Sequence, residues 1–222
     1  MLKKWIEDIR VKTKDMDRKG TVEYIAAYYW YHILIAAIML FLIVLLIYHL
    51  AWGNRRKSFA LAIVNQQINY ERDEKLLNEF SESSDINSRK LSVDSDYLFS
   101  YDDIKLEGVN ESSFEKFFLG WQIGSIDAAI IPESLYNYCV RQDGEFTDLE
   151  KIYPKLLTGD NEKRKESLYM QNGKYTGIYI EKTKLADDFI IDNKDPVMLV
   201  FLENNNRHIT QCRKFIEFVF AE

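Results

Sequence analysis

The chain has 222 residues, with 29 Lys and Arg against 35 Asp and Glu, and a formal net charge of −6. The first 52 residues carry 7 basic and 5 acidic residues, whereas the rest carries 22 basic and 30 acidic residues, a net charge of −8. This acidic balance argues against nucleic acid and anionic lipid surfaces as partners of the larger part. Two cysteines, Cys139 and Cys212, are too few for a disulfide scaffold or a zinc site with the usual paired spacing.

Residues 1–23 are predicted to form a cytoplasmic amphipathic segment. Apolar residues recur there at helical spacing, with basic residues between and after them, which is typical of a helix lying on a membrane surface. The apolar set is Leu2, Trp5, Ile6 and Ile9. A short solvated tail with incidental periodicity is the alternative.

Residues 24–52 are predicted to form a transmembrane helix. The uninterrupted apolar run Ile33–Ile47 lies inside this segment, and as a helix Ile33–Trp52 would reach about 30 Å, the thickness of a hydrocarbon core. Tyrosine and tryptophan crowd both ends, where amphipathic rings settle at the headgroups. A buried helix of a soluble protein is the alternative, although uncharged runs of this length are rare there.

Basic residues near the span predict its orientation. Seven Lys and Arg precede it and three, Arg55, Arg56 and Lys57, closely follow it, so we expect a cytoplasmic amino terminus and a large extracytoplasmic domain. The apolar run is longer than that of a cleaved signal peptide and is followed by polar and basic residues, which favours a retained anchor. The chain is therefore expected in the cell membrane as a single-pass protein. His32 and His49 flank the span, and we expect no proton-relay role for them.

Residues 53–222 are predicted to form one three-layer α/β domain. Continuous apolar runs at Phe59–Val64, Ala128–Ile131 and Val197–Leu202 are typical of strands in a covered, mainly parallel sheet. Helical patterns lie between them. One expected helix covers Glu71–Ser81, and another is opened by Pro132. A third is opened by a Ser112–Glu115 capping box and has one face formed by Phe114, Phe117, Phe118 and Trp121. The last starts at about Arg207 with Asn206 as cap, and its inward face is formed by Ile209, Cys212, Phe215, Ile216 and Val219.

Two further segments break the alternation of strands and helices. Asn172-Gly173 separates Leu168–Gln171 from Tyr175–Ile180 and predicts a two-residue β-hairpin. Thr158–Asn161 is expected to be an exposed polar loop, and so is the segment Ser81–Lys90.

Three local patterns give the larger part a resemblance to a known family. They are Gly124–Pro132, a helix end followed by a small-residue strand; Phe146–Leu149; and Pro196–Phe220, a strand, polar turn and closing helix. Together they resemble an extracytoplasmic solute-binding protein of the type II periplasmic-binding class. The anchor is similar to that of single-span proteins of Gram-positive bacteria. The family has two lobes around its ligand, but only about 35 residues, Glu133–Ser167, stand where a second lobe would be inserted, so a single lobe is expected.

Polar residues after the strands are the candidate ligand-binding residues. Open α/β sheets bind ligands beyond the carboxyl ends of their strands, and the resemblance implies the same place. The set is Asn65 and Gln66 after the first strand, Ser95 and Asp96 near the second, and Glu133 and Ser134 after the third. Each residue could equally cap a helix or hold a loop, which is the more common role of such residues.

No catalytic residue, metal site or cofactor is predicted. The acidic group Asp94, Asp96, Asp102 and Asp103 lacks the glycine and the final glutamate of a calcium-binding EF-hand loop. No nucleophile-elbow, zincin, phosphate-loop or dinucleotide motif occurs, and His208 is the single histidine of the larger part. Cys139 and Cys212 both fall on apolar helix faces and are expected to stay free, with one bridge between them as the alternative.

The sequence thus supports two hypotheses for function. The first is a membrane-anchored, non-enzymatic binding module that recognises a small solute, a peptide or a membrane protein, as an accessory or sensor of a transporter. The second is a structural or assembly subunit of a membrane protein complex without a small-molecule ligand. An enzyme would require a deep pocket that gathers His208 with carboxylates.

Overall fold

The computed structural model describes residues 7, 10–14, 16–49, 57–109, 111–156, 162–189, 194–203 and 208–221. The chain divides into two compact units, Met1–Arg55 and Arg56–Glu222. The predicted apolar residues of the amphipathic segment, Leu2, Trp5, Ile6 and Ile9, lie outside the described residues, as does the loop Thr158–Asn161.

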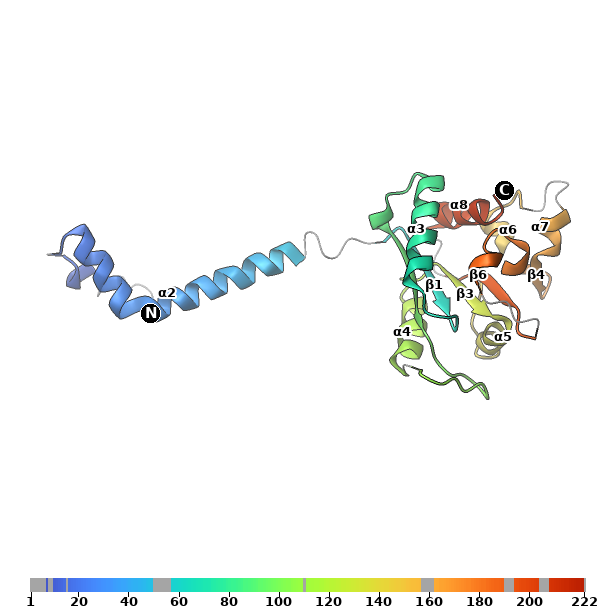
Figure 1. Ribbon diagram of the computed structural model, residues 1–222, viewed down its shortest axis with the longest axis horizontal. Helices are drawn as coiled ribbons and strands as arrows, with labels where there is room; N and C mark the ends of the chain where they lie inside the picture. Colours follow the sequence, from blue (N-terminus) through green and yellow to red (C-terminus); the bar gives the residue numbers. More distant parts are fainter. Residues whose placement is uncertain are drawn as a thin grey trace. The chain divides into compact units, whose positions relative to one another are not determined.

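The first unit contains one long helix, α2 (Arg18–Tyr48), drawn in blue in Figure 1. Asp17 caps it by accepting a hydrogen bond from the Gly20 backbone N–H at 2.8 Å. No Asp, Glu, Lys or Arg occurs from Tyr24 to Tyr48, and none of the helix is buried. Its 31 residues reach about 46 Å. Within the described part of the chain, α2 is the helix whose length and composition suit a membrane crossing, and it begins six residues before the predicted span.

The second unit is built on one six-stranded sheet in the order β2-β1-β3-β6-β5-β4. Parallel pairing joins β1 to β2 and to β3, and antiparallel pairing joins β3 to β6, β6 to β5 and β5 to β4. The strands are β1 (Phe59–Val64), β2 (Leu91–Tyr97), β3 (Ala128–Pro132), β4 (Leu168–Gln171), β5 (Lys174–Tyr179) and β6 (Val197–Phe201).

The prediction of a mainly parallel sheet is wrong, because β6 runs against β3 with Ala128 opposite Phe201 and Pro132 opposite Val197. A strand buried on both faces has the same apolar pattern whichever way it runs, so composition does not determine its direction. The sheet is therefore mixed, with a parallel half and an antiparallel half.

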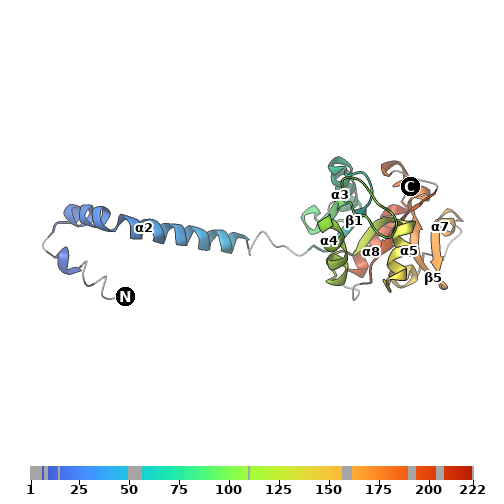
Figure 2. The ribbon, with the colours of Figure 1, turned by 90° about the horizontal axis from the view of Figure 1, so that it is seen from below.

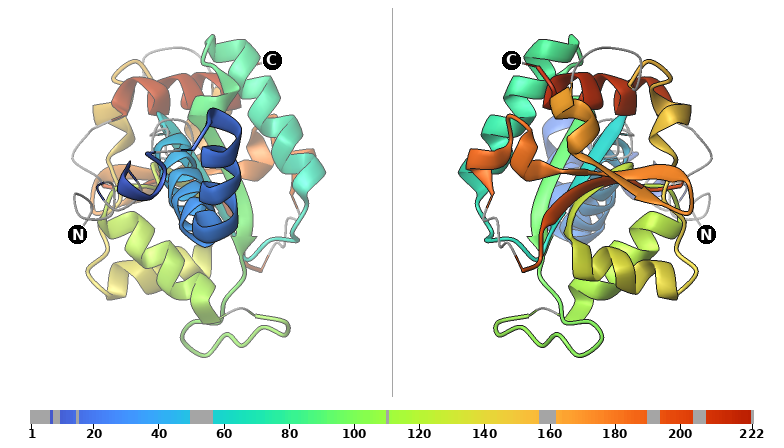
Figure 3. Two further views of the ribbon diagram at one scale, coloured as in Figure 1. Left: turned by 90° about the vertical axis from the view of Figure 1, so that its left-hand side faces the viewer. Right: turned by 90° about the vertical axis from the view of Figure 1, so that its right-hand side faces the viewer.

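Helices cover both faces of the sheet, as Figure 3 shows, and make the predicted three layers. One core lies between the sheet and α3 (Tyr70–Ser84), α6 (Leu149–Ile152) and α8 (Ile209–Val219), and a second lies between the sheet and α4 (Glu111–Gln122) and α5 (Glu133–Arg141). Strand β1 serves both, since Phe59, Leu61 and Ile63 belong to the first core and Ala62 and Val64 to the second. Every residue of the two cores falls between positions 59 and 220, so the second unit holds its own complete core.

The helices follow the predicted apolar faces with shifted ends. They are α3 (Tyr70–Ser84), α4 (Glu111–Gln122), α5 (Glu133–Arg141), α6 (Leu149–Ile152), α7 (Glu162–Glu166) and α8 (Ile209–Val219), with 3₁₀ turns η2 (Ser88–Lys90), η3 (Ile180–Lys182) and η4 (Ala186–Asp188). Helix α3 extends into the predicted Ser81–Lys90 loop and ends at Ser84, and its cap residue Asp85 has a left-handed φ of 55°.

Three predicted helix starts are wrong by a short distance. Helix α4 begins at Glu111, so Ser112 lies inside it rather than capping it. Pro132 ends β3 and precedes α5 as its cap residue. Helix α8 begins at Ile209 with His208 at its cap position, two residues later than expected, and the predicted cap Asn206 lies outside the described residues. End positions depend on local backbone geometry more than on the apolar pattern.

The hairpin is confirmed. Asn172 and Gly173 both have positive φ, 50° and 77°, and they join β4 to β5 as a primed turn requires. Segment 133–167, where a second lobe would be inserted, instead contributes α5 to one core and α6 to the other. Figure 2 shows this unit from below, and in Figure 1 α5 and α8 lie on opposite sides of the sheet.

Candidate functional site

The predicted site lies at the edge where β1, β2 and β3 end, which we call the carboxyl edge. The register places the end of β5 and the start of β6 there too, because Tyr179 pairs with Met198 and Pro132 pairs with Val197. Five segments far apart in the sequence therefore supply side chains to one edge.

Asn65 follows β1 and holds a loop at this edge. Its φ of 53° is left-handed, a conformation that Asn tolerates better than most residues. Its side-chain amide donates to the Phe99 carbonyl at 3.0 Å, and its amide oxygen accepts from the Phe99 N–H at 2.9 Å. Asn65 thus substitutes for a strand partner and fixes the chain after β2.

Ser134 belongs to a second group of hydrogen bonds at this edge. Its hydroxyl donates to Asp195 Oδ2 at 2.6 Å and its backbone N–H donates to Asp195 Oδ1 at 2.9 Å. The Tyr101 hydroxyl lies 2.7 Å from Ser134 Oγ. Burial raises the pKa of Tyr101, while its hydrogen-bonding contacts with Ser134 and Asn65 oppose that rise. Tyr101 therefore joins the Asn65 and Ser134 groups into one cluster with Asp195.

Glu133 lies beside this cluster and accepts a hydrogen bond from the Tyr179 hydroxyl at 3.3 Å. Burial, together with the negative charge of Glu133, raises the pKa of Tyr179 to about 12. Tyr179 therefore stays protonated and able to donate at neutral pH.

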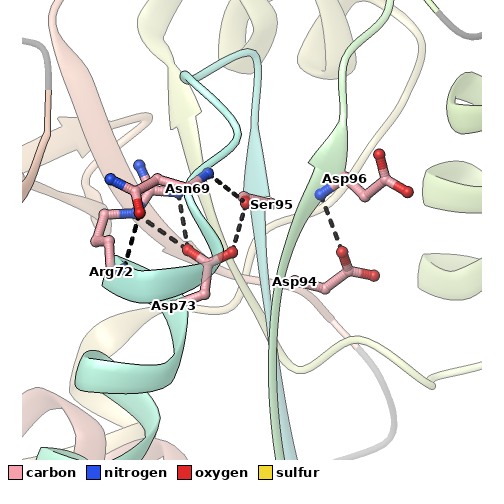
Figure 4. A network of polar contacts seen from close by, with 6 residues as sticks. All are labelled: Asn69, Arg72, Asp73, Asp94, Ser95 and Asp96. Atoms are coloured by element: carbon pink, nitrogen blue, oxygen red, sulfur yellow. Dashed lines mark hydrogen bonds and ion pairs between the residues drawn. The ribbon is translucent and has the colours of Figure 1, made fainter.

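Ser95 and Asp96 lie on opposite faces of β2, as Figure 4 shows. Ser95 is buried and donates a short hydrogen bond to Asp73, which also pairs with Arg72 at 2.8 and 3.0 Å. Asn69 caps α3 and donates its backbone N–H to Ser95 Oγ at 3.4 Å. This buried network ties α3 to β2.

Asp96 is exposed and lies on the face that carries Asp94. Its backbone N–H donates to Asp94 Oδ1 at 2.9 Å, and Asp94 in turn pairs with Lys116 of α4 at 2.8 Å. Strand β2 therefore does not direct Ser95 and Asp96 into one crevice.

Gln66 is the predicted site residue with an unsatisfied group. Its side-chain oxygen is buried and has no hydrogen-bond partner within the described part of the chain. A buried acceptor without a partner is costly, so Gln66 is the position at this edge where a ligand donor would gain most.

Metal ligation has no support at the four aspartates considered above. Asp94 pairs with Lys116, and Asp102 pairs closely with Arg141. A search of the described ranges finds no group of three or more His, Cys, Asp or Glu placed to hold a metal ion.

His208 has a carboxylate partner that the sequence did not reveal. Its Nδ1 lies 2.8 Å from Oδ1 of Asp127, which is 3 % exposed, and Asp127 Oδ2 accepts from the Ala60 N–H at 2.8 Å. This pair lies at the opposite edge, where β1 and β3 begin, which we call the amino edge. A buried aspartate that orients a histidine occurs in catalytic triads. In this domain the pair also ties α8 to the sheet.

Both cysteines are free and buried, as expected from their apolar helix faces. Burial raises the pKa of Cys139 to about 12 and raises that of Cys212 as well, with the charge of Asp127 adding to the effect at Cys212. Neither thiol therefore supplies a thiolate nucleophile near neutral pH.

Two pockets lie at the amino edge and were missed from the sequence. One encloses about 520 Å³ between the carboxyl-terminal ends of α4 and α5, and the other encloses about 280 Å³ beside the β4–β5 hairpin. They share Gly144, Glu145 and Glu203 in their linings. The aromatic pattern of α4 was visible in the sequence, but the carboxylates come from two distant loops.

Comparisons with known proteins supply no relative. No protein-family model, no curated protein and no solved structure matches this chain.

Proposed function

We propose that the chain is a single-pass membrane protein that displays its α/β domain outside the cytoplasm as a non-enzymatic binding module. The anchor is supported by α2, whose apolar side chains are not buried by the protein, such as Leu40 at 63 % and Phe41 at 61 % exposure. A bilayer would cover that surface. The excess of basic residues before the span supports a cytoplasmic amino terminus.

The observation that carries the binding role is the convergence of Asn65, Tyr101, Ser134 and Asp195 at the carboxyl edge. The amino-terminal ends of α3 and α5 reach the same edge, and the partial positive charge of helix amino termini favours acceptor groups of a ligand. Because the side chains already bond to one another, the loops that carry them are held in place. Such preorganisation lowers the entropic cost of binding.

Binding rather than catalysis is supported by the chemistry of the domain. The histidine lies at the amino edge, away from this cluster, and both thiols are protonated and buried. The ligand class that suits the carboxyl edge is a small polar solute or a peptide, which hydrogen-bonding side chains and helix ends can orient. A transporter accessory or sensor is the role that combines such a site with an anchor.

Thermal-shift screening of residues 56–222 against amino acids, sugars and short peptides tests this role, with titration calorimetry of each compound that stabilises the domain. Ligand binding at the carboxyl edge should be weakened by Gln66→Leu and left unchanged by Gln211→Leu, since Gln211 lies in the first turn of α8 and lines neither amino-edge pocket. Absence of stabilisation by every compound would remove the small-ligand role.

An assembly subunit is the second candidate, and a different observation favours it. The amino-terminal half of α2 carries exposed aromatic residues, among them Tyr28 at 65 % and Trp30 at 60 % exposure, which suit packing against helices of a partner. Crosslinking in native membranes separates the two candidates. One stoichiometric protein partner in the absence of ligand supports assembly, whereas a monomer that binds a solute supports the binding module.

A further inference from the structure

The larger pocket at the amino edge is the starting point. Its volume of about 520 Å³ falls within the range of small-molecule sites. It is lined by the ends of α4 and α5, with Phe118 and Trp121 on α4, and by Asp143, Gly144, Glu145 and Glu203.

An aromatic wall forms one side of this pocket. Trp121 stacks on Phe118 with ring centroids 6.3 Å apart and lies against Phe146 at 5.0 Å. Gly144 permits this position, because a Cβ there would lie 3.0 Å from Cη2 of Trp121 and 2.8 Å from the Cys139 carbonyl oxygen. The indole therefore lies directly against the backbone that leads into Glu145.

Two carboxylates lie next to each other on the other side. The Phe146–Leu202 bridge is antiparallel, and the Glu203 N–H donates a hydrogen bond to the Glu145 carbonyl at 3.4 Å. Glu145 and Glu203 are therefore direct neighbours on two paired segments of the chain. Like charges placed opposite each other are destabilising. Asp143 adds a third carboxylate, and within the described residues none of the three has an ion-pair partner.

The backbone around the pocket adds partial negative charge to that of the carboxylates. Helices α4 and α5 both end at the pocket, and helix carboxyl termini carry partial negative charge. Among the described lining residues there is no Lys or Arg. Lys151 and Lys174 line the smaller pocket beyond Glu145 and Glu203 instead.

We infer that this pocket is a binding site for a small organic cation, with the ammonium group between the carboxylates and Trp121 and the apolar body on the aromatic wall. The cation would relieve the repulsion between Glu145 and Glu203 and would gain a cation–π contact with the indole. This site is separate from the carboxyl edge and does not depend on ligand binding there.

Trp121 also provides the test, because it is the only tryptophan after Trp52. The domain of residues 56–222 has its own complete core, so its tryptophan fluorescence reports the surroundings of this one side chain. Titration with choline should give a saturable change in Trp121 emission, with calorimetry as a second readout. The neutral isostere of choline, in which tert-butyl replaces trimethylammonium, should bind at least about tenfold more weakly.

Variants locate the site. Glu145→Gln combined with Glu203→Gln should weaken choline binding by more than about tenfold, whereas Glu82→Gln, an exposed carboxylate on α3, should leave it unchanged. Trp121→Phe keeps the packing but weakens the cation–π contact, and calorimetry should show reduced affinity. The inference is overturned if the double variant binds choline as tightly as the wild type does, or if the wild type binds the neutral isostere as tightly as it binds choline. It is equally overturned if no saturable signal develops up to about 50 mM choline, which would fill a millimolar site.

Discussion

Helix α2 and the central strands of the sheet are both apolar, but they differ in how far the protein buries their side chains. In α2 the apolar side chains are exposed, as at Phe41 with 61 %, whereas the apolar residues of β1, β3 and β6 are covered on both faces by helices. Phe215 of α8 is fully buried among Phe59, Phe80 and Phe218, with ring centroids 4.9 to 5.8 Å apart. Apolar length alone is therefore ambiguous. What separates a core element from a membrane element is whether distant parts of the same chain supply its cover.

The largest expected effect comes from removing the same ring in each region. Phe215→Ala should lower the free energy of unfolding of the domain by about 3–5 kcal/mol, because it leaves a cavity in a rigid core. Phe41→Ala, the matched change in α2, should leave it unchanged. Urea unfolding of the full chain in detergent micelles, followed by circular dichroism, measures both. Equal losses would mean that α2 is part of the domain's core.

A charge in α2 tests the membrane assignment. Leu42→Arg should disfavour membrane insertion by about 2.5–3.5 kcal/mol on the insertion scale, because the residue lies within the longest uncharged run. The change should not affect the stability of the domain. Fractionation of membranes after alkaline extraction, with Leu42→Ile as control, measures retention. Full retention of Leu42→Arg together with a destabilised domain would contradict the assignment.

The polar carboxyl edge should contribute less than the core. Ser134→Ala removes the hydroxyl shared by Asp195 and Tyr101 and should cost about 1–3 kcal/mol of unfolding free energy, since it leaves partly buried partners unsatisfied. Ser92→Ala in β2 is the control and should stay within about 0.5 kcal/mol. Chemical denaturation of residues 56–222 distinguishes these values. If Ser134→Ala left the free energy of unfolding unchanged, the cluster would not hold the loops.

The smallest effect is expected at alkaline pH. The pKa of Tyr179 is raised to about 12 from its ordinary value of 10.0, so the folded domain holds this proton more strongly than the unfolded chain. The resulting stabilisation is fully present below pH 10 and is lost as the pH rises through about 12. Tyr179→Phe should therefore lose less stability than the wild type across this window, as measured by urea midpoints at each pH. Identical pH profiles would contradict the raised pKa of Tyr179.

Local signals predicted much of the fold. Continuous apolar runs located β1, β3 and β6, and Asn172-Gly173 located the hairpin, because a primed turn needs residues that tolerate positive φ. The direction of β6 could not be predicted, since it depends on the path of the chain after β5 rather than on the composition of the strand.

The sequence predicted where several candidate residues lie in the sheet, but not which residues they contact. Chain order placed Asn65, Glu133 and Ser134 at one edge, whereas their partners Phe99, Tyr179 and Asp195 lie 34 to 61 residues away in the sequence. Alternation along β2 separates Ser95 from Asp96, which the sequence could have indicated once the strand's limits were known. The amino-edge pocket depends on a close approach at Gly144, and no local pattern reports such a contact.

The most direct test of the account is the sidedness of the two units. Cys139 and Cys212 are 1 % and 8 % exposed with raised pKa values, so a membrane-impermeant maleimide should report mainly on an introduced cysteine. In intact spheroplasts we expect Glu82→Cys in the domain to be labelled and Met16→Cys before α2 to be protected, with both labelled after lysis. Labelling of Met16→Cys together with protection of Glu82→Cys would contradict the proposed topology and, with it, an extracytoplasmic binding module.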